Sequence, residues 1–280
     1  MATDDDIRAR QRRTWDTLSG GWEKWDAVIM DQMAPVSGAI IDGLSVGDGA
    51  RVLDIASGTG EPGLTIAAQA PHSTVVLTDL SEEMLAVARR RAAARGVTNI
   101  ETHVCSADDL PFDDASFDAV SVRFGLMFFP DMANATRELV RVLKPGGRMA
   151  ASVWINPADN PWTSILMDAI GSEVELPPPD PNGPNMYRCA GPGFVRGLFE
   201  DAGLREVSEA DVRVELVTQS SAQYWDVMSE HVSLAVAALE QCDAATRERM
   251  RARAMEQVAP FERDGAVRVP GAARCVVGTK

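Results

Sequence analysis

The stretch "RVLDIASGTGEPG", residues 51–63, joins a short apolar run to a glycine-rich loop. Within that loop, Gly58, Gly60 and Gly63 have the spacing G-x-G-x-x-G. The apolar run predicts a buried strand, and the following "PGLTIAAQA", residues 62–70, predicts a helix. A glycine loop between a strand and a helix is typical of dinucleotide-binding folds, in which N–H groups at the helix N-terminus bind the pyrophosphate.

Strand and helix patterns go on alternating beyond this loop. Residues 73–80, "STVVLTDL", predict a second strand, and residues 81–96 predict a helix that is capped by Ser81 and ends at Gly96. We expect further strands at 99–105, 117–124 and 148–154, and a further helix at 131–147. Strands separated by helices predict an α/β fold with a parallel sheet and right-handed crossovers.

The segments on either side of this alternation are mostly helical. The first 45 residues place apolar and aromatic side chains three or four positions apart, which predicts helices. Late in the chain we expect helical insertions at about 157–203 and 221–258. The sequence therefore predicts an N-terminal helical segment, 1–45, followed by one sheet domain, 46–280, that carries both insertions.

Composition and charge narrow the classes of function. Of the 280 residues, 41 are acidic and 27 basic, so that the net charge is −14, which argues against a nucleic-acid partner. No apolar stretch is long enough to span a bilayer, and the acidic start, "MATDDDIRAR", lacks the apolar core of a signal peptide, so that we expect a cytoplasmic protein without a membrane partner. The basic run at 88–95 is interpreted as a solvated helix face. The four cysteines form no C-x-x-C pair, and we expect no metal site.

Acidic residues around the glycine loop bear on the choice of ligand. Asp54 lies near the end of the first strand and Glu61 lies inside the loop, while the loop itself holds no Lys or Arg. Two carboxylates would repel a pyrophosphate and attract a cationic sulfonium and ammonium, as in S-adenosylmethionine. Asp79 ends the second strand, where a carboxylate can accept hydrogen bonds from the two hydroxyls of a ribose.

Four motifs in order then resemble one family. They are "VLDIASGTGEPG" (52–63), "LTDLSEEML" (77–85), "LPFDDASFDAV" (110–120) and "LKPGG" (143–147). The resemblance covers about residues 50–155 and is to class I S-adenosylmethionine-dependent methyltransferases, in the small-molecule branch related to ubiquinone and menaquinone biosynthesis. It implies a Rossmann-like sheet of seven strands, one of them antiparallel, with helices on both faces. The N-terminal helices and the late helical insertion would then form a lid over the pocket.

The resemblance also implies roles for particular residues. Those expected to contact the cofactor are Asp54, Ala56, Gly58 and Gly60 at its methionine part, Asp79 at its ribose, Leu80, Met84, Ser106 and Ala107 near its adenine, and Arg123 at its carboxylate. Ser106 departs from the pattern, because many relatives have an aspartate at that place. For Arg123, a structural ion pair is the alternative interpretation. Trp22, Trp25 and Phe124 are the residues expected in the substrate pocket. Of the three tryptophans Trp15, Trp22 and Trp25, two are expected to dock the N-terminal helices onto the sheet, and Trp22 or Trp25 to contact the pocket.

The expected reaction is in-line transfer of a methyl group to the oxygen, carbon or nitrogen of a small apolar or aromatic molecule. Such a transfer requires a nucleophile held near ~3 Å from the methyl group, and a general base only for some acceptors. His231, Tyr187 and Tyr224 are the weak candidates for that base. Two alternatives stay open: a nicotinamide-dependent oxidoreductase, favoured by the glycine spacing and Asp79, and a non-catalytic protein that binds S-adenosylmethionine.

Overall fold

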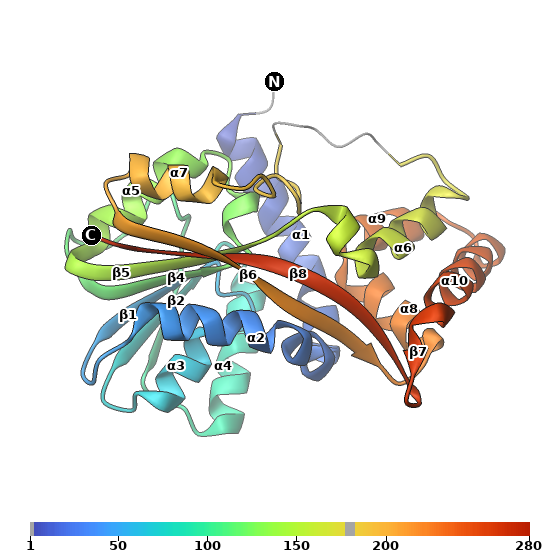
Figure 1. The fold of residues 1–280 in the computed structure, drawn as a ribbon, viewed down its shortest axis with the longest axis horizontal. Helices are drawn as coiled ribbons and strands as arrows, with labels where there is room; N and C mark the ends of the chain where they lie inside the picture. The colour runs from blue at the N-terminus through green and yellow to red at the C-terminus, as the bar shows by residue number, and fades with distance from the viewer. Residues whose placement is uncertain (1–2, 177–182) are drawn as a thin grey trace.

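A computed structural model describes residues 3–176 and 183–280 of the chain (Figure 1). Its centre is one mixed sheet in the order β3-β2-β1-β4-β5-β8-β6. The strands are β1 Arg51–Ile55, β2 Thr74–Asp79, β3 Ile100–Val104, β4 Phe117–Arg123, β5 Leu143–Trp154, β6 Arg205–Thr218 and β8 Ala266–Thr279; the short β7, Glu262–Arg263, pairs with β8. Neighbours from β3 to β5 are parallel, whereas β8 runs antiparallel to β5 and β6. The predicted sheet with one antiparallel main strand is therefore confirmed.

Helices cover both faces of this sheet (Figure 1). Helices α2 (Asp26–Leu44), α3 (Gly63–Gln69) and α4 (Glu82–Arg95) lie on one face, and α5 (Met132–Val142) and α7 (Phe194–Asp201) lie on the other. Because both faces are covered, the inner strands can be apolar along their whole length, and four of the five residues of β1 are buried. The alternating pattern predicts such an α/β fold, and the family resemblance implies this Rossmann-like arrangement with helices on both faces.

The remaining helices gather at one end of the sheet, beside the far ends of β6 and β8 (Figure 1). They are α6 Pro161–Gly171, α8 Ser221–His231, α9 Ser233–Glu240 and α10 Ala244–Val258. The first helix, α1 (Asp4–Lys24), contacts both α4 and α8. Residues 177–182 of the predicted insertion at 157–203 lie outside the described residues. No helix that the structure describes is both long and apolar enough to cross a bilayer.

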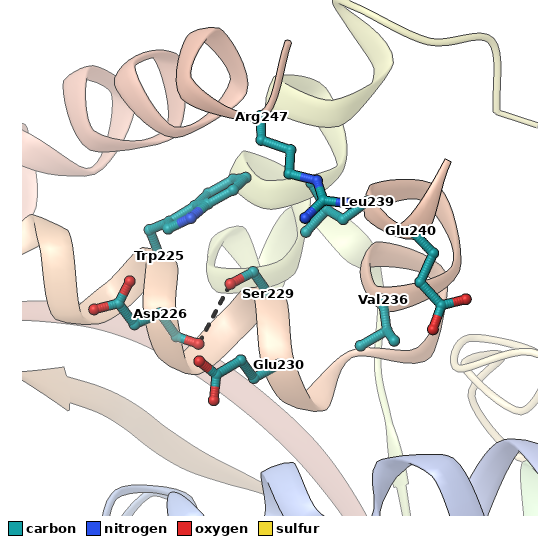
Figure 2. Close-up of a pocket in the computed structure, with 8 residues that line it drawn as sticks. All are labelled: Trp225, Asp226, Ser229, Glu230, Val236, Leu239, Glu240 and Arg247. Carbon is teal, nitrogen blue, oxygen red and sulfur yellow. Dashed lines mark hydrogen bonds between the residues drawn. The ribbon is translucent and has the colours of Figure 1, made fainter. Parts of the chain in front are cut away.

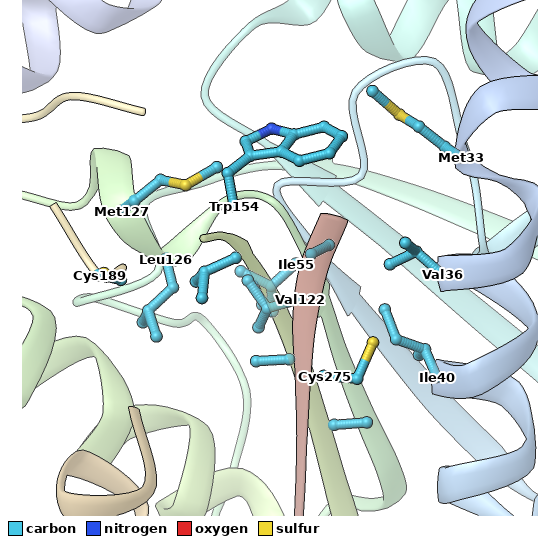
Figure 3. Close-up of a cluster of buried hydrophobic side chains, with 14 of the residues drawn as sticks. Met33, Val36, Ile40, Ile55, Val122, Leu126, Met127, Trp154, Cys189 and Cys275 are labelled. Atoms are coloured by element: carbon cyan, nitrogen blue, oxygen red, sulfur yellow. The ribbon is translucent and has the colours of Figure 1, made fainter. Parts of the chain in front are cut away.

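A buried apolar cluster fixes helix α2 against the sheet (Figure 3). Met33, Val36 and Ile40 of α2 belong to the same cluster as Val122 of β4 and Trp154 of β5. Val36 and Ile40 are completely buried. The packing places the first turns of α2 close to the carboxyl ends of β4 and β5, which is the edge of the sheet where parallel α/β folds bind ligands.

Candidate active site

The glycine loop follows β1 at the carboxyl edge of the sheet. Ala56, Gly58 and Gly60 all have positive φ, at 50°, 52° and 105°. A Cβ at Gly60 would lie 2.7 Å from the Cδ1 atom of Leu64, so that this glycine is required by packing, whereas a Cβ at Gly58 would meet no protein atom within 4 Å. Gly58 therefore leaves the backbone of the loop open to close approach by a ligand.

Asp79, at the end of β2, is hydrogen-bonded to the glycine loop. Its carboxylate accepts from the backbone N–H of Gly58 and of Ser81, both at 2.9 Å. Burial raises the pKa of Asp79 to about 6. Ser81 caps α4 by accepting from the Met84 N–H, as predicted. The structure thus brings Asp79 and Gly58 together, although their cofactor roles stay predictions.

Asp54 is enclosed by protein groups. Its Oδ1 accepts from the Ser121 hydroxyl at 2.6 Å, and its Oδ2 accepts from the Gly63 N–H at 3.0 Å. Complete burial raises its pKa to about 7. Asp54 therefore connects β1, β4 and the start of α3, and its hydrogen bond to Gly63 holds the end of the glycine loop in place.

The charge of the loop differs from the expectation drawn from the sequence. Glu61 forms ion pairs with Arg95, at 2.5 Å, and with Arg91, at 3.6 Å. The Arg91 side chain is only 10% exposed, and it also donates to the Thr59 carbonyl at 2.5 Å. The expectation of an uncompensated acidic loop is wrong, and so is the interpretation of the whole 88–95 run as solvated. The reason is that α4 packs against the loop and brings Arg91 and Arg95 to Glu61. The charge of the loop alone therefore does not decide whether it binds a sulfonium or a pyrophosphate.

Helix α1 crosses the residues predicted to surround adenine. The Ser106 hydroxyl donates to Asp108, and Asp108 forms an ion pair with Arg8 of α1 at 2.5 Å. Further along α1, the Asp16 carboxylate accepts a hydrogen bond from the Ser81 hydroxyl at 2.6 Å. Of the other predicted adenine contacts, Met84 and Ala107 are buried, and Leu80 is partly buried.

Aromatic rings continue along α1 toward α8. Trp15 meets Phe128 edge-on at 5.4 Å and Trp22 at 6.2 Å, and Trp22 meets the His231 ring at 5.8 Å. Trp25 differs, because its indole N–H donates to Glu230 of α8 at 2.9 Å. The indole nitrogen of Trp22 is buried and has no hydrogen-bond partner among the described residues. Trp25 therefore docks α1 onto α8, whereas the Trp22 indole N–H is not used in that docking.

Phe124 and Arg123 stand side by side in sequence at the end of β4. The Phe124 ring stacks on Trp154 with a centroid distance of 4.1 Å and an interplanar angle of 11°. Arg123 donates to the Ser37 hydroxyl at 3.2 Å and to the Met30 sulfur at 3.5 Å. Within the described ranges, no carboxylate lies within 4.0 Å of its guanidinium. Burial lowers the pKa of Arg123 to about 10. The structural ion pair is thus wrong as an alternative, and the guanidinium is available to an anion.

The three candidate bases have different surroundings. The Tyr224 hydroxyl is completely buried and donates to the Trp162 carbonyl at 2.7 Å. The Tyr187 hydroxyl lies 2.5 Å from the Thr163 hydroxyl, and burial raises the pKa of both tyrosines. His231 places Nδ1 2.6 Å from the Val227 carbonyl, which makes Nδ1 the donor and leaves Nε2 as the basic nitrogen. Burial lowers the pKa of His231 to about 4.

One polar residue of interest carries no signal in the sequence. Gln32 of α2 is 1% exposed, and neither its amide nitrogen nor its amide oxygen has a hydrogen-bond partner among the described residues. The Ser57 hydroxyl, in the glycine loop, is likewise buried without a partner. A single glutamine on a helix belongs to no motif, so that only the three-dimensional structure identifies it.

A cavity of about 350 Å³ lies among α8, α9 and α10 (Figure 2). Its lining includes Trp225, Leu239, Arg247, Asp226 and Ser229. The Ser229 hydroxyl donates to the Asp226 backbone carbonyl at 3.4 Å. None of the lining residues belongs to the predicted cofactor set. The cavity is therefore separate from the glycine loop.

The fold and the loop define a Rossmann-like methyltransferase architecture. The YcgJ protein of Bacillus subtilis has a TM-score of 0.55 and 22% identity, covering 87% of this chain and 97% of that one. A phosphoethanolamine N-methyltransferase from Haemonchus contortus has a TM-score of 0.59 and 16% identity, covering 100% and 60%. The [4+2]-cyclase SpnF has a similar TM-score of 0.54 at 20% identity, covering 87% and 79%, so that the shared fold alone does not determine the reaction.

Comparison of sequences is more specific. Residues 16–160 match the ubiE/COQ5 methyltransferase family, and the chain belongs to that family. A demethylmenaquinone methyltransferase of Clavibacter sepedonicus is 40% identical over 154 residues, which are 55% of this chain and 57% of that protein. The ubiquinone/menaquinone biosynthesis C-methyltransferase UbiE of Ralstonia pickettii is 36% identical over 208 residues, 69% of this chain and 78% of that protein. The chain spans about half the length of several curated relatives that it matches.

Proposed function

We propose that the chain binds S-adenosylmethionine on the glycine loop and transfers its methyl group to a small aromatic acceptor. The observation that carries the proposal is the partly buried Arg123 guanidinium, which has no carboxylate within 4.0 Å among the described residues and ends the strand next to the glycine loop. Its hydrogen-bond partners, Ser37 and Met30, are uncharged, and the methionine carboxylate would supply a directly bonded anion. Membership of the ubiE/COQ5 family supports this choice of cofactor.

The other residues present also fit this cofactor. Gly58 leaves room for close approach, and Asp79 beside it offers carboxylate oxygens to a ribose. A carboxylate has about four lone-pair sites, so that Asp79 can hold its backbone donors and still accept from a ribose hydroxyl. When bound, the cofactor supplies a methyl group that its sulfonium already activates.

The chain's own contribution would be orientation and exclusion of water. The stacked rings of Phe124 and Trp154 form a flat apolar surface against which an aromatic acceptor can pack. Trp15 and Trp22 on α1 would cover the site. These contacts would hold the acceptor atom in line with the methyl group, which is the main requirement of the reaction.

The acceptor that we propose is a reduced quinone ring. The support is the names of the relatives, which refer to demethylmenaquinone and to ubiquinone and menaquinone biosynthesis, together with the aromatic surface. For a ring hydroxyl, a base would assist, and the neutral Nε2 atom of His231 is the candidate, because Nδ1 already donates to Val227. Tyr224 and Tyr187 are not part of this proposal, since their hydroxyls have protein partners.

Calorimetric titration tests the cofactor. Wild-type protein is titrated with S-adenosylmethionine, S-adenosylhomocysteine and NAD, and the titrations are repeated with Asp79→Ala. We expect micromolar binding of the first two ligands, weakened about 10- to 100-fold in the variant by the loss of charge-assisted hydrogen bonds. Binding of NAD alone would reject the proposal in favour of an oxidoreductase.

Incubation with a reduced naphthoquinone and mass spectrometry then tests the reaction. A product heavier by one methyl group in place of hydrogen is expected. Binding of S-adenosylmethionine without methylation of any reduced quinone supplied would point instead to the non-catalytic alternative.

A further inference from the structure

Gln32 is the buried polar side chain of α2 that the cofactor does not explain. It shares a helix stripe with Ile29 and Val36, which are both completely buried, so that its side chain lies on the face of α2 that packs toward the sheet. Both ends of its amide lack hydrogen-bond partners within the described part of the chain. Leucine would fill the same kind of site without this penalty.

The turn of α2 that carries Gln32 lies at the edge where methyl transfer would occur. Met30 on this turn accepts a hydrogen bond from Arg123 at the end of β4. Met33, also on this turn, belongs to the buried cluster of Trp154 at the end of β5 (Figure 3). Gln32 therefore shares a helical turn with Met30 and Met33, and its side chain lies on a different face of α2 from that of Met30, because residues two apart on a helix do not face each other.

The chemistry of the amide indicates what would satisfy it. The amide nitrogen donates and the amide oxygen accepts, so that a hydroxyl group, which does both, is a suitable partner. Buried polar groups in native proteins are almost always paired, and an unpaired one in a ligand-binding region points to a ligand group as the partner. A site built to bind a substrate hydroxyl also rejects analogues that lack it.

We propose that Gln32 determines acceptor specificity by binding a second ring oxygen, distinct from the part of the ring that receives the methyl group. The inference rests on the proposed function and deepens it, because it selects aromatic acceptors with two oxygen substituents over those with one. Gln32 acts by positioning the ring and takes no part in proton transfer. The Trp22 N–H, which is also buried and unpartnered, is a second donor on the neighbouring helix.

The test compares two probes that differ by one hydroxyl. Binding of naphthohydroquinone and of α-naphthol is measured by calorimetry under nitrogen, with protein saturated with S-adenosylhomocysteine. The variants are Gln32→Leu and, as the matched control, Gln69→Leu, which makes the same chemical change at an exposed position of α3. Thermal unfolding of each protein without ligands is recorded alongside.

We expect wild type and the Gln69→Leu control to bind naphthohydroquinone at least 10-fold more tightly than α-naphthol, and Gln32→Leu to lose that preference. Gln32→Leu should also raise Tm by about 2–4 °C, because it removes an unpaired buried amide, while its affinity for S-adenosylhomocysteine stays the same. The inference is overturned if wild type shows no preference between the probes, or if Gln32→Leu keeps it. Failure of wild type to bind S-adenosylhomocysteine is a separate result, which removes the proposed function and this inference with it.

Discussion

The two sides of the candidate site treat their buried polar groups differently. On the side where we propose that the cofactor binds, called the cofactor side, Asp54, Glu61 and Asp79 each accept at least two hydrogen bonds from protein donors. On the side where we propose that the acceptor binds, called the acceptor side and carried by α1, α2 and α8, the Trp22 N–H and the Gln32 amide have no partners among the described residues.

This difference indicates how each side is specified. A loop whose carboxylates already accept hydrogen bonds from protein donors is preorganised and presents one fixed shape to its ligand. A surface that leaves amide and indole groups unpaired is less stable alone and gains most when a ligand pairs them. The Ser57 hydroxyl is the exception on the cofactor side, and it lies in the loop that a ligand would touch. Each of the following predictions tests how far the two sides are separate.

Arg91 connects the two sides, and its removal should have the largest effect. Its guanidinium donates to Thr59 in the glycine loop and forms ion pairs with Glu61 and, at 3.1 Å, with Asp26 at the start of α2. Arg91→Ala would leave Glu61 with Arg95 alone and would remove the ion pair of the partly exposed Asp26, and we expect a loss of about 3 kcal/mol in the free energy of unfolding. Urea denaturation measures it.

The matched control is the neighbouring Arg90, whose pair with Glu23 is exposed on both partners. Arg90→Ala should cost less than about 1 kcal/mol, as surface ion pairs do. Arg91→Ala should also weaken binding of S-adenosylhomocysteine, whereas Arg90→Ala should not. Equal losses for the two variants would show that Arg91 does not join the sides.

His231 on the acceptor side should make stability depend on pH. Burial lowers its pKa to about 4 in the folded protein, from 6.5 in its absence. Between these values the unfolded chain binds more protons than the folded chain, so stability is complete above pH 6.5 and falls as the pH drops toward 4. The expected contribution is on the order of 3 kcal/mol over this window.

Urea denaturation at several pH values between 4 and 7 isolates this contribution as the difference between wild type and His231→Phe. Asp54 and Asp79, whose pKa values are raised, give the opposite trend in both proteins and therefore cancel from the difference. His72→Gln, at an exposed position, should behave as wild type. A pH-independent difference would mean that water reaches the His231 ring.

The sequence predicted the local structure around the glycine loop better than the contacts among α1, α2 and α8, for physical reasons. Apolar runs bounded by glycines specify β1 and the loop locally, and Asp79 and the Ser81 cap follow from their positions at element ends. The neutralisation of Glu61 by Arg91 and Arg95 depends on how α4 packs, which no local pattern encodes.

The acceptor side shows the same limit more strongly. Trp22 and Trp25 have equivalent places in the pattern, yet one keeps an unpaired N–H and the other donates to Glu230. Gln32 is a single amide among apolar neighbours and matches no motif. Roles that arise where separate helices meet are visible only after those helices have been placed.

Two adjacent glycines of α1 give the smallest but sharpest test of the acceptor side. A Cβ at Gly21 would lie 2.1 Å from the Glu230 carbonyl oxygen, whereas a Cβ at Gly20 would meet nothing within 4 Å. Gly21→Ala should therefore push α1 away from α8 and cost about 1–3 kcal/mol. Gly20→Ala should stabilise the protein by about 0.5–1 kcal/mol, because alanine has a higher helix propensity than glycine at this exposed position.

Urea denaturation and the rate of proteolysis within α1 measure both variants. The same glycine-to-alanine change should slow cleavage at one position and accelerate it at the next. If Gly21→Ala also stabilised the protein, α1 would not rest on α8 as closely as the Gly21 contact requires. The Trp22–His231 contact, which depends on that approach, would then no longer define the acceptor side.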